Sequence, residues 1–293
     1  MRVRSSHSFR FLRRGGGTNT VEVAQAAESL AAPEATMLYE WTLRDPSAEV
    51  TARLFSADGI LHFWTSDAGW YRIEPASGRI EMSDYPDELR REQRLWGIPT
   101  VLCAKNRGDL VLHAAGVEVN GGAILLAAPG RFGKTTLALA FHREGYRLLT
   151  EDTAVCSLAS DPLLFPGPTS IRIRPDMFDG QAPAGTTLVA ARGDRIHLAL
   201  DADRMGDGRP VPIRALVFLR ESSDRIVLER VKKGEAIPDL WTLSFRFPDE
   251  AERRRSFSQL ARLATVVPVW NVYRPLRVDR LQEIVSQLLT LSH

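Results

Sequence analysis

The chain has 293 residues, which is long enough for one large domain or two modest ones, each with a core of its own. Its composition is 44% apolar and 25% charged with a formal net charge of +2, as in soluble globular proteins, and this excludes a chain built overall to bind a polyanion. No run approaches the ~20 apolar residues of a membrane span, and no apolar stretch of the kind found in secretory signals follows the basic start, so we expect a cytoplasmic protein with no membrane partner.

The first 35 residues are predicted to be a flexible basic arm. Five arginines and His7 fall within the first fourteen positions, and no acidic residue lies among them. Such an arm can contact nucleic acid, membrane or an acidic partner, but we favour a solvated arm and do not expect a nucleic-acid partner. An alanine-rich stretch at residues 21–32 is predicted to form a short helix.

Residues 36–85 form a β-rich N-terminal region in this interpretation. Alternating apolar and polar residues predict strands over residues 37–41, 50–55, 60–64 and 70–73, and residues 66–69 form a hairpin turn between the last two. The aromatic residues of these strands are interpreted as the core of a small sheet rather than as a surface on which bases stack.

Residues 86–108 are predicted to be a helical connector. Pro86 precedes a helical pattern, and Pro99 interrupts it, which predicts two helices or one sharply kinked helix. The second helix is expected over residues 100–105 and ends at the stop signal of residues 106–108.

The remaining residues, 109–293, have the strand and helix pattern of an α/β nucleotide-binding domain with a mixed sheet. An alternating strand over residues 110–119 leads through the hairpin turn Asn120-Gly121 into an apolar strand at residues 123–127. Later strands are predicted at residues 146–150, 153–158, 169–174, 197–200, 213–219, 226–231 and 266–272, and later helices at residues 249–264 and 278–289.

The two cysteines, Cys103 and Cys156, lie far apart in the sequence. We interpret them as small buried apolar residues of a reducing compartment, and the absence of CxxC or paired histidines argues against structural zinc.

The sequence around residue 130 has the order strand, glycine-containing loop and helix, and it matches the P-loop (Walker A) pattern G-x-x-x-x-G-K-[ST] except that Ala128 replaces the first glycine. Such a loop cradles a polyphosphate with main-chain amides and a helix N-terminus. Lys134 supplies a cation for the β- and γ-phosphates of ATP, and the hydroxyl of Thr135 can enter the coordination shell of Mg²⁺. The alternative is an ordinary turn before a helix, with a solvated lysine. The predicted ATP-binding residues are Pro129, Gly130, Arg131, Phe132, Gly133, Lys134, Thr135 and Thr136.

An acidic pair, Glu151-Asp152, follows the next predicted strand at its carboxyl end, where ligands bind in open α/β sheets. One carboxylate can hold Mg²⁺ and the other can accept a proton from an attacking hydroxyl. The alternative is a solvated acidic turn. His113 lies in the strand just before the hairpin, where it is either a hydrogen-bonded core histidine or part of the site.

The segment LVLHAAGVEVNGGAILLAAPGRFGKTTLALAFHREGYRLLTEDTAV resembles the core of the HPr kinase/phosphorylase family and its HPr-kinase-like relatives. The shared features are the strand histidine, the hairpin, the P-loop and the acidic pair. The resemblance covers residues 109–158 well and the later strands more loosely.

This resemblance implies a fold like the nucleotide domain of phosphoenolpyruvate carboxykinase and an ATP- and Mg²⁺-dependent kinase that acts on a hydroxyl. By position, Glu151 would be the catalytic base, and Asp152, with Thr135, would lie at the metal. His113 would position or neutralise the acidic pair and the phosphate. Relatives of this kind phosphorylate a serine in the precursors of ribosomal peptides such as lasso peptides, so the partner implied is a peptide or small protein with a serine-like hydroxyl. Family members are often hexameric, which makes a homo-oligomer a further hypothesis.

The chain differs from the family at three positions. Glu151 replaces an aspartate, Ala128 replaces a glycine, and Arg172 stands about where the family has a metal-binding glutamate. Arg172 and Arg174 can grip phosphate or have a structural role.

Two rival functions stay open from the sequence. The first is a regulatory module that binds a nucleotide without transferring phosphate, and the second is a phosphorylase or carboxykinase-like enzyme that uses the same residues in another direction.

Overall fold

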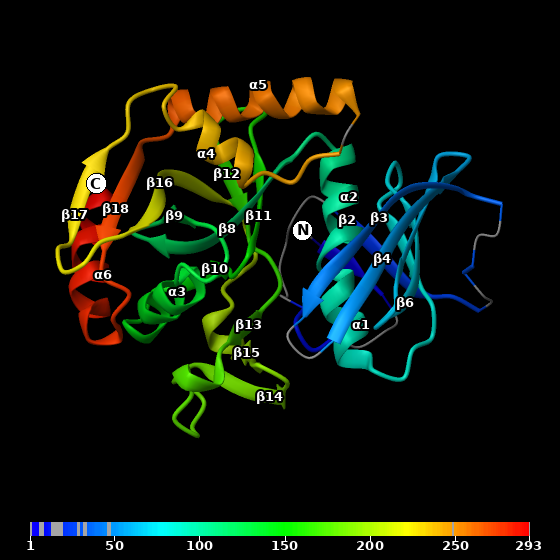
Figure 1. Cartoon of the computed structure of the whole chain (residues 1–293), viewed down its shortest axis with the longest axis horizontal. Helices are drawn as coiled ribbons and strands as arrows, with labels where there is room; N and C mark the ends of the chain where they lie inside the picture. Colours follow the sequence, from blue (N-terminus) through cyan, green and yellow to red (C-terminus); the bar gives the residue numbers. More distant parts are fainter. Residues whose placement is uncertain are drawn as a thin grey trace.

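The computed structural model describes residues 2–5, 9–12, 20–27, 30–31, 34–45, 48–247 and 249–292. These residues form a mixed α/β molecule with a seven-stranded N-terminal sheet, an eight-stranded central sheet and a three-stranded small sheet (Figure 1). Within them, no helix is both long enough and apolar enough to cross a membrane.

The N-terminal sheet has the strand order β1-β2-β7-β6-β5-β4-β3. Its first two pairings, β1 with β2 and β2 with β7, are parallel, and the others are antiparallel. The strands are β1 (Arg2–Arg4), β2 (Thr20–Gln25), β3 (Thr36–Asp45), β4 (Ala48–Ala57), β5 (Ile60–Thr65), β6 (Gly69–Glu74) and β7 (Arg79–Met82).

The helix predicted at residues 21–32 is wrong where the structure describes this segment. Residues 20–25, part of which was predicted as a helix, form strand β2, because Val21 and Val23 alternate with polar neighbours and are both buried. Phe11, within the predicted flexible arm, is fully buried in the N-terminal core. The rest of the predicted arm, residues 1, 6–8, 13–19, 28–29 and 32–33, lies outside the described residues.

Two helices, α1 (Glu88–Leu95) and α2 (Ile98–Asn106), connect the N-terminal sheet to the central sheet. The sequence predicted either two helices or one kinked helix. Two helices are found, but the break falls at residues 96–97 and not at Pro99. Pro99 lies in the first turn of α2, where its missing N–H has no intrahelical acceptor to lose, so it begins the second helix instead of interrupting one.

The central sheet is built around two long strands, β8 (Leu110–Val119) and β16 (Val211–Glu221). Strand β9 (Gly122–Ala127) pairs with both of them, antiparallel to β8 and parallel to β16. On their other edges, β8 and β16 are also connected through two short antiparallel strands, β11 (Thr153–Ser157) and β12 (Leu163–Phe165). β11 pairs with β8, β12 pairs with β16, and β11 and β12 pair with each other. The remaining strands are β10 (Arg147–Thr150) beside β8, β18 (Val269–Arg274) parallel to β16, and β17 (Val227–Arg230) at the edge.

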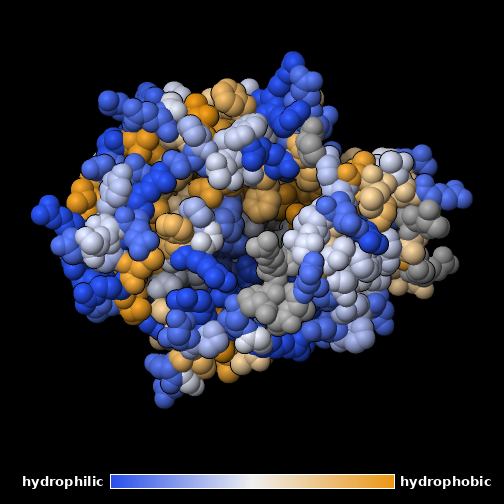
Figure 2. Space-filling view, in the orientation of Figure 1, coloured by the Kyte–Doolittle hydropathy of each residue, from blue (hydrophilic) through white to orange (hydrophobic). Residues whose placement is uncertain are grey.

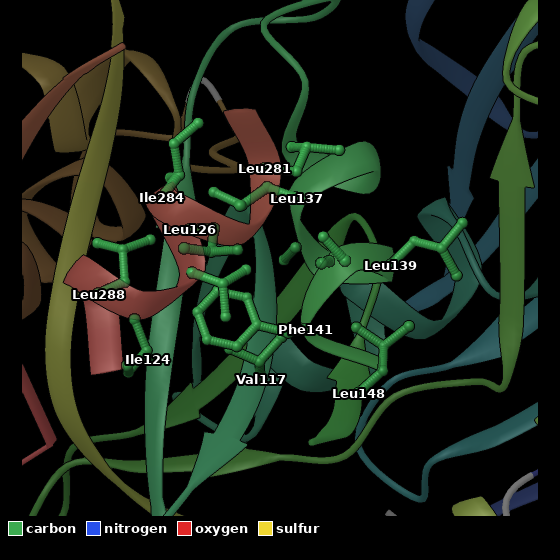
Figure 3. Packing of buried hydrophobic residues seen from close by; sticks show 14 of the residues in the cluster. Val117, Ile124, Leu126, Leu137, Leu139, Phe141, Leu148, Leu281, Ile284 and Leu288 are labelled. Atoms are coloured by element: carbon green, nitrogen blue, oxygen red, sulfur yellow. The ribbon is translucent and has the colours of Figure 1, made fainter. Parts of the chain in front are cut away.

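Strand β9 is apolar on both faces because each face of the sheet is covered by helices (Figure 1). Ile124 and Leu126 enter one core with α3 (Lys134–Arg143) and α6 (Leu281–Leu289), and Figure 3 shows these side chains interdigitating. Leu125 and its neighbours at positions 123 and 127 enter the opposite core, with α4 (Ile237–Thr242) and α5 (Glu250–Val266). A continuous apolar run of this kind is typical of a central strand.

The small sheet has the order β13-β15-β14 and is wholly antiparallel. Its strands are β13 (Ser170–Ile173), β14 (Thr186–Arg192) and β15 (Arg195–Leu200). Short 3₁₀ turns occur at Pro175–Met177, Ala202–Arg204, Val278–Arg280 and Thr290–Ser292.

Several short or exposed strands and one short helix were not predicted from the sequence. Strand β12 has three residues, β7 has four, and β14 has an exposed face with little apolar alternation. Helix α4 was also not predicted. The strand expected at residues 266–272 lies at Val269–Arg274, because α5 continues to Val266 and Pro268 separates helix from strand.

Candidate active site

The loop at residues 128–133, called the glycine loop below, connects β9 to α3 and has two residues with positive φ, Arg131 (φ 68°) and Gly133 (φ 74°). Gly133 is the N-cap of α3, and a Cβ at this position would lie 2.7 Å from Nη2 of Arg274. Glycine is therefore required here by both its φ and its close neighbour. Gly130 has no positive φ and no neighbour that a side chain would strike, so neither its backbone conformation nor its packing requires a glycine.

Strand β8 brings the glycine loop and the acidic pair together. On one edge of β8, Ala114 faces Ala127, the last residue of β9 before the loop. On the other, β10 ends with Thr150 opposite Gly116, and β11 begins with Thr153 opposite His113. The turn formed by residues 151–152 therefore lies across β8 from the glycine loop, with His113 between them.

Lys134, the first residue of α3, is buried and folds back over the glycine loop. Its Nζ lies 2.9 Å from the carbonyl oxygen of Ala128, 2.8 Å from Nε2 of His113 and 4.0 Å from Oδ1 of Asp152. Nδ1 of His113 in turn lies 3.4 Å from Oδ1 of Asp152. A protonated lysine requires Nε2 of His113 to be the acceptor, which leaves Nδ1–H directed at the carboxylate.

Glu151 is buried, with 7% of its surface exposed, and both of its oxygens have partners. The hydroxyl of Thr135 donates to Oε1 at 2.8 Å, and Nε of Arg172 donates to Oε2 at 3.3 Å. Arg172 also reaches Oδ2 of Asp152 through Nη2 at 3.4 Å. The two carboxylates are therefore bridged by one guanidinium from β13.

Burial shifts the titration of three of these groups. It lowers the pKa of His113, an effect that the carboxylate of Asp152 opposes. It also lowers the pKa of Lys134, against the influence of Asp152 and Glu151. Burial raises the pKa of Glu151, while the charge of Arg172 acts in the opposite direction. A glutamate with a raised pKa is a better proton acceptor than an exposed one.

A cavity of about 370 Å³ opens over these residues. On the face shown in Figure 2, the surface is hollowed between the part that holds the central sheet and the N-terminal sheet. Four arginines and Lys134 line the cavity together with two carboxylates, which leaves an excess of positive charge suited to a polyphosphate. The lining residues are His113, Gly130, Arg131, Gly133, Lys134, Thr135, Thr136, Glu151, Asp152, Arg172, Ile173, Arg174, Met177 and Arg195.

Most residues predicted for the site therefore line one cavity, but Pro129 and Phe132 do not. The carbonyl oxygen of Pro129 faces Nζ of Lys134 at 3.5 Å. Phe132 packs against the core beneath α3, and its carbonyl oxygen accepts a hydrogen bond from Arg274. Arg174, which lines the cavity, forms an exposed ion pair with Asp176.

Arg274 is a site residue that the sequence analysis missed. It ends β18, is 3% exposed, and donates from Nη2 to the carbonyl oxygen of Phe132 at 2.5 Å. Burial lowers the pKa of its guanidinium. Its position was recognisable in principle, because it ends a strand parallel to β16 and β9, and the carboxyl ends of parallel strands meet at one edge of a sheet.

The oxygen ligands of the cavity suit Mg²⁺ better than a transition metal. Within the described residues, no three His, Cys, Asp or Glu side chains gather closely enough to hold a metal ion. Mg²⁺ usually takes one or two carboxylates together with phosphate oxygens and water. The hydroxyl of Thr135 and the carboxylate of Asp152, both lining the cavity, fit that set.

Neither a family model nor a curated protein sequence matches this chain. Among solved structures, the Hpr(Ser) kinase/phosphatase from Coxiella burnetii aligns with 62% of this chain and 99% of its own, at 12% sequence identity and a TM-score of 0.32.

Proposed function

We propose that this protein is an ATP-dependent kinase that transfers the γ-phosphoryl group to a serine-like hydroxyl of a peptide or small protein. The observation that carries the proposal is the single positively charged cavity in which Lys134, the start of α3 and the pair Glu151-Asp152 meet. The glycine loop serves as the P-loop, and a ribosomal peptide precursor of the lasso type is one acceptor of this class.

The nucleotide end of the cavity supplies hydrogen-bond donors and positive charge. The N-terminus of α3 presents main-chain N–H groups and a partial positive charge to the phosphates. Lys134 is held at the loop by the carbonyl oxygen of Ala128, so its charge stays near the β- and γ-phosphates. Arg274 fixes the loop from below through Phe132, which keeps the amides in place.

The transfer requires one proton acceptor and one displaced group. The acceptor oxygen attacks the γ-phosphorus, the bond from phosphorus to the β,γ-bridging oxygen breaks, and ADP leaves with that electron pair. The hydroxyl proton passes to Glu151, whose buried position favours the protonated form. Thr135 and Asp152 are the residues that would hold Mg²⁺, which neutralises phosphate charge when it is bound.

The test is transfer of label from γ-labelled ATP to serine-containing peptides. Lys134→Ala removes the cation and is expected to lower transfer by roughly a thousandfold or more. Lys134→Met keeps the buried aliphatic volume and should lose as much, which separates lost charge from lost packing.

Lys233→Ala is the matched control, because Lys233 is exposed and does not line the cavity. Its rate should equal that of the wild type. Near-normal transfer by folded Lys134→Ala, as judged by circular dichroism, would reject the proposed function.

One observation favours a second candidate, a nucleotide-binding module without transfer. Arg172 pairs with both carboxylates and so compensates the charge of the base. Such a module would bind ATP with a thermal shift that depends on Lys134 but would label no acceptor, and the same experiment distinguishes it from a kinase.

A further inference from the structure

A second cavity of about 300 Å³ adjoins the first. Glu151, Asp152 and Arg172 line both cavities, so the acidic pair stands at their junction. A γ-phosphate in the first cavity and a hydroxyl group in the second would therefore meet at the proposed base.

The second cavity lies between the N-terminal sheet, the connector helices and the central sheet, and its walls are largely apolar. Phe63 comes from β5, Trp96 and Ile98 from the junction of α1 and α2, and Pro168 and Phe245 from loops beside the central sheet. This wall suits a bulky apolar side chain.

Two polar side chains of this wall, Arg94 and Gln93, already have partners. Arg94 forms an ion pair with Asp67 at 2.6 Å, and the amide of Gln93 lies 2.6 Å from Nδ1 of His197. The cavity therefore lacks the surplus of positive charge that marks the nucleotide end, and it does not suit an anionic acceptor.

Strand β13 runs along both cavities. Ser170 and Arg172 line the second, and Arg172 and Ile173 line the first. β13 is the end strand of its sheet: the N–H of Thr169, just before it, is bonded to the carbonyl oxygen of Phe11, but β13 itself pairs only with β15 among the described strands. Within the described residues, its second edge is therefore free to pair with an extended chain. Residues two apart on a strand face the same side, as Ser170 and Arg172 do.

We propose that the acceptor is an extended peptide segment that pairs with the open edge of β13. The hydroxyl residue lies at Glu151-Asp152, and an apolar residue two positions away fills the wall formed by Phe63, Trp96, Ile98, Pro168 and Phe245. This inference rests on the proposed function. It assigns acceptor recognition jointly to the small sheet and the N-terminal region.

The probe is a set of capped heptapeptides with one central serine among alanines. They carry leucine two positions before the serine, two positions after it, or nowhere, and γ-labelled ATP reports transfer. One leucine peptide is expected to have a kcat/KM at least about tenfold above the all-alanine peptide, through KM, because burial of a leucine favours binding by this order.

Phe245→Ala should abolish the leucine preference and leave the thermal shift caused by ATP and Mg²⁺ unchanged. Phe257→Ala is the matched control, since Phe257 is half exposed on α5 and lines neither cavity, and it should keep the preference.

Peptides N-methylated at alternate amides test the strand pairing without altering the protein. Methylation of one alternate set should lower kcat/KM at least about tenfold and methylation of the other set should not, because only one set faces the partner strand. Equal rates for all peptides, or for free serine, would overturn the inference and leave the kinase assignment standing. Binding of ATP without labelling of any acceptor would reject the proposed function, and the inference with it.

Discussion

Lysine is rare in this protein, with four lysines against 34 arginines, and two of the four are buried. Lys134 contacts a carbonyl oxygen and a histidine nitrogen, and Lys105 contacts a carboxylate and a hydroxyl. An ammonium group is a compact point charge, whereas a guanidinium is a planar fork that needs more room. The two buried lysines therefore lie where a cation must fit a small polar recess.

His197 makes a testable contribution to stability at the residue scale. It lies on β15, is 5% exposed, and accepts a hydrogen bond from Gln93. Burial, and then the charges of Arg172, Arg90, Arg192 and Arg195, lower its pKa from 6.5 to about 4. The folded protein therefore keeps a neutral imidazole over a pH range in which the unfolded chain binds a proton.

Because the unfolded chain binds this proton more tightly, the free energy of unfolding falls as the pH is lowered. The contribution of His197 is fully present above pH 6.5, the unfolded value, and is lost as the pH falls toward about 4. Between about pH 7 and pH 5, the wild type should lose roughly 1 to 2 kcal/mol more unfolding free energy than His197→Asn, which keeps an acceptor but does not titrate. Urea unfolding at both pH values measures this, and equal losses would contradict the pKa of His197.

Some residues of the site could be predicted from the sequence, and others could not. Lys134, Thr135, Glu151 and His113 follow from a loop motif and strand ends within 40 residues, and they meet as local strand pairing requires. The ion pairs of Arg172 with the acidic pair do not follow from any local pattern, and only the family resemblance places residue 172 near the metal site. Arg172 reaches the pair because the small sheet lies beside β10 and β11.

At the scale of elements, apolar periodicity predicted the long strands and the helices that cover them. Apolar periodicity failed at residues 20–25, because the two valines and one alanine of this segment are compatible with either a helix or a strand. Residues 20–25 form a strand because they pair with β7, where Val23 lies opposite Ile80. Tertiary contacts of this kind outweigh propensity.

Helix α5 is anchored to α2 by a buried polar cluster. Nζ of Lys105 lies 2.5 Å from Oε1 of Glu252 and 2.9 Å from Oγ of Ser256. Glu252 also accepts from the N–H of Phe247, just before the helix. Lys105→Met would leave a buried carboxylate without its cation, at a cost of about 3 kcal/mol of unfolding free energy.

A second substitution tests whether the cost comes from that carboxylate. Lys105→Met combined with Glu252→Gln keeps the acceptor for Phe247 but removes the charge, and it should recover about 2 kcal/mol of the loss. The exposed pair Arg254–Glu250 on the same helix serves as control, because Arg254→Met should cost less than about 0.5 kcal/mol. Additive losses in the double variant would show that the pair is not coupled.

At the scale of the whole molecule, the N-terminal sheet shares its core with the rest of the chain. The N–H of Phe11 donates to Glu92 of α1 at 2.8 Å, and its carbonyl oxygen accepts from Thr169, next to β13, at 2.8 Å. The core beneath the sheet also contains Leu89, Leu95 and further side chains of α1 and α2. The boundary predicted at residues 85–86 therefore runs through one shared core.

Removal of residues 1–85 tests this sharing, and with it the predicted separation of the N-terminal region. The remaining chain would expose the apolar faces of α1 and α2, including Leu95 and Trp96, which are now buried. Exposed apolar patches of this size cause association, so we expect residues 86–293 to be poorly soluble and to bind the dye ANS. Co-expression of residues 1–85 should restore solubility by covering the patch. The opposite outcome is that residues 86–293 are soluble alone and unfold cooperatively at the same temperature as the full chain. The N-terminal sheet would then be an independent domain, and Phe63 would line the second cavity from a separately folded domain.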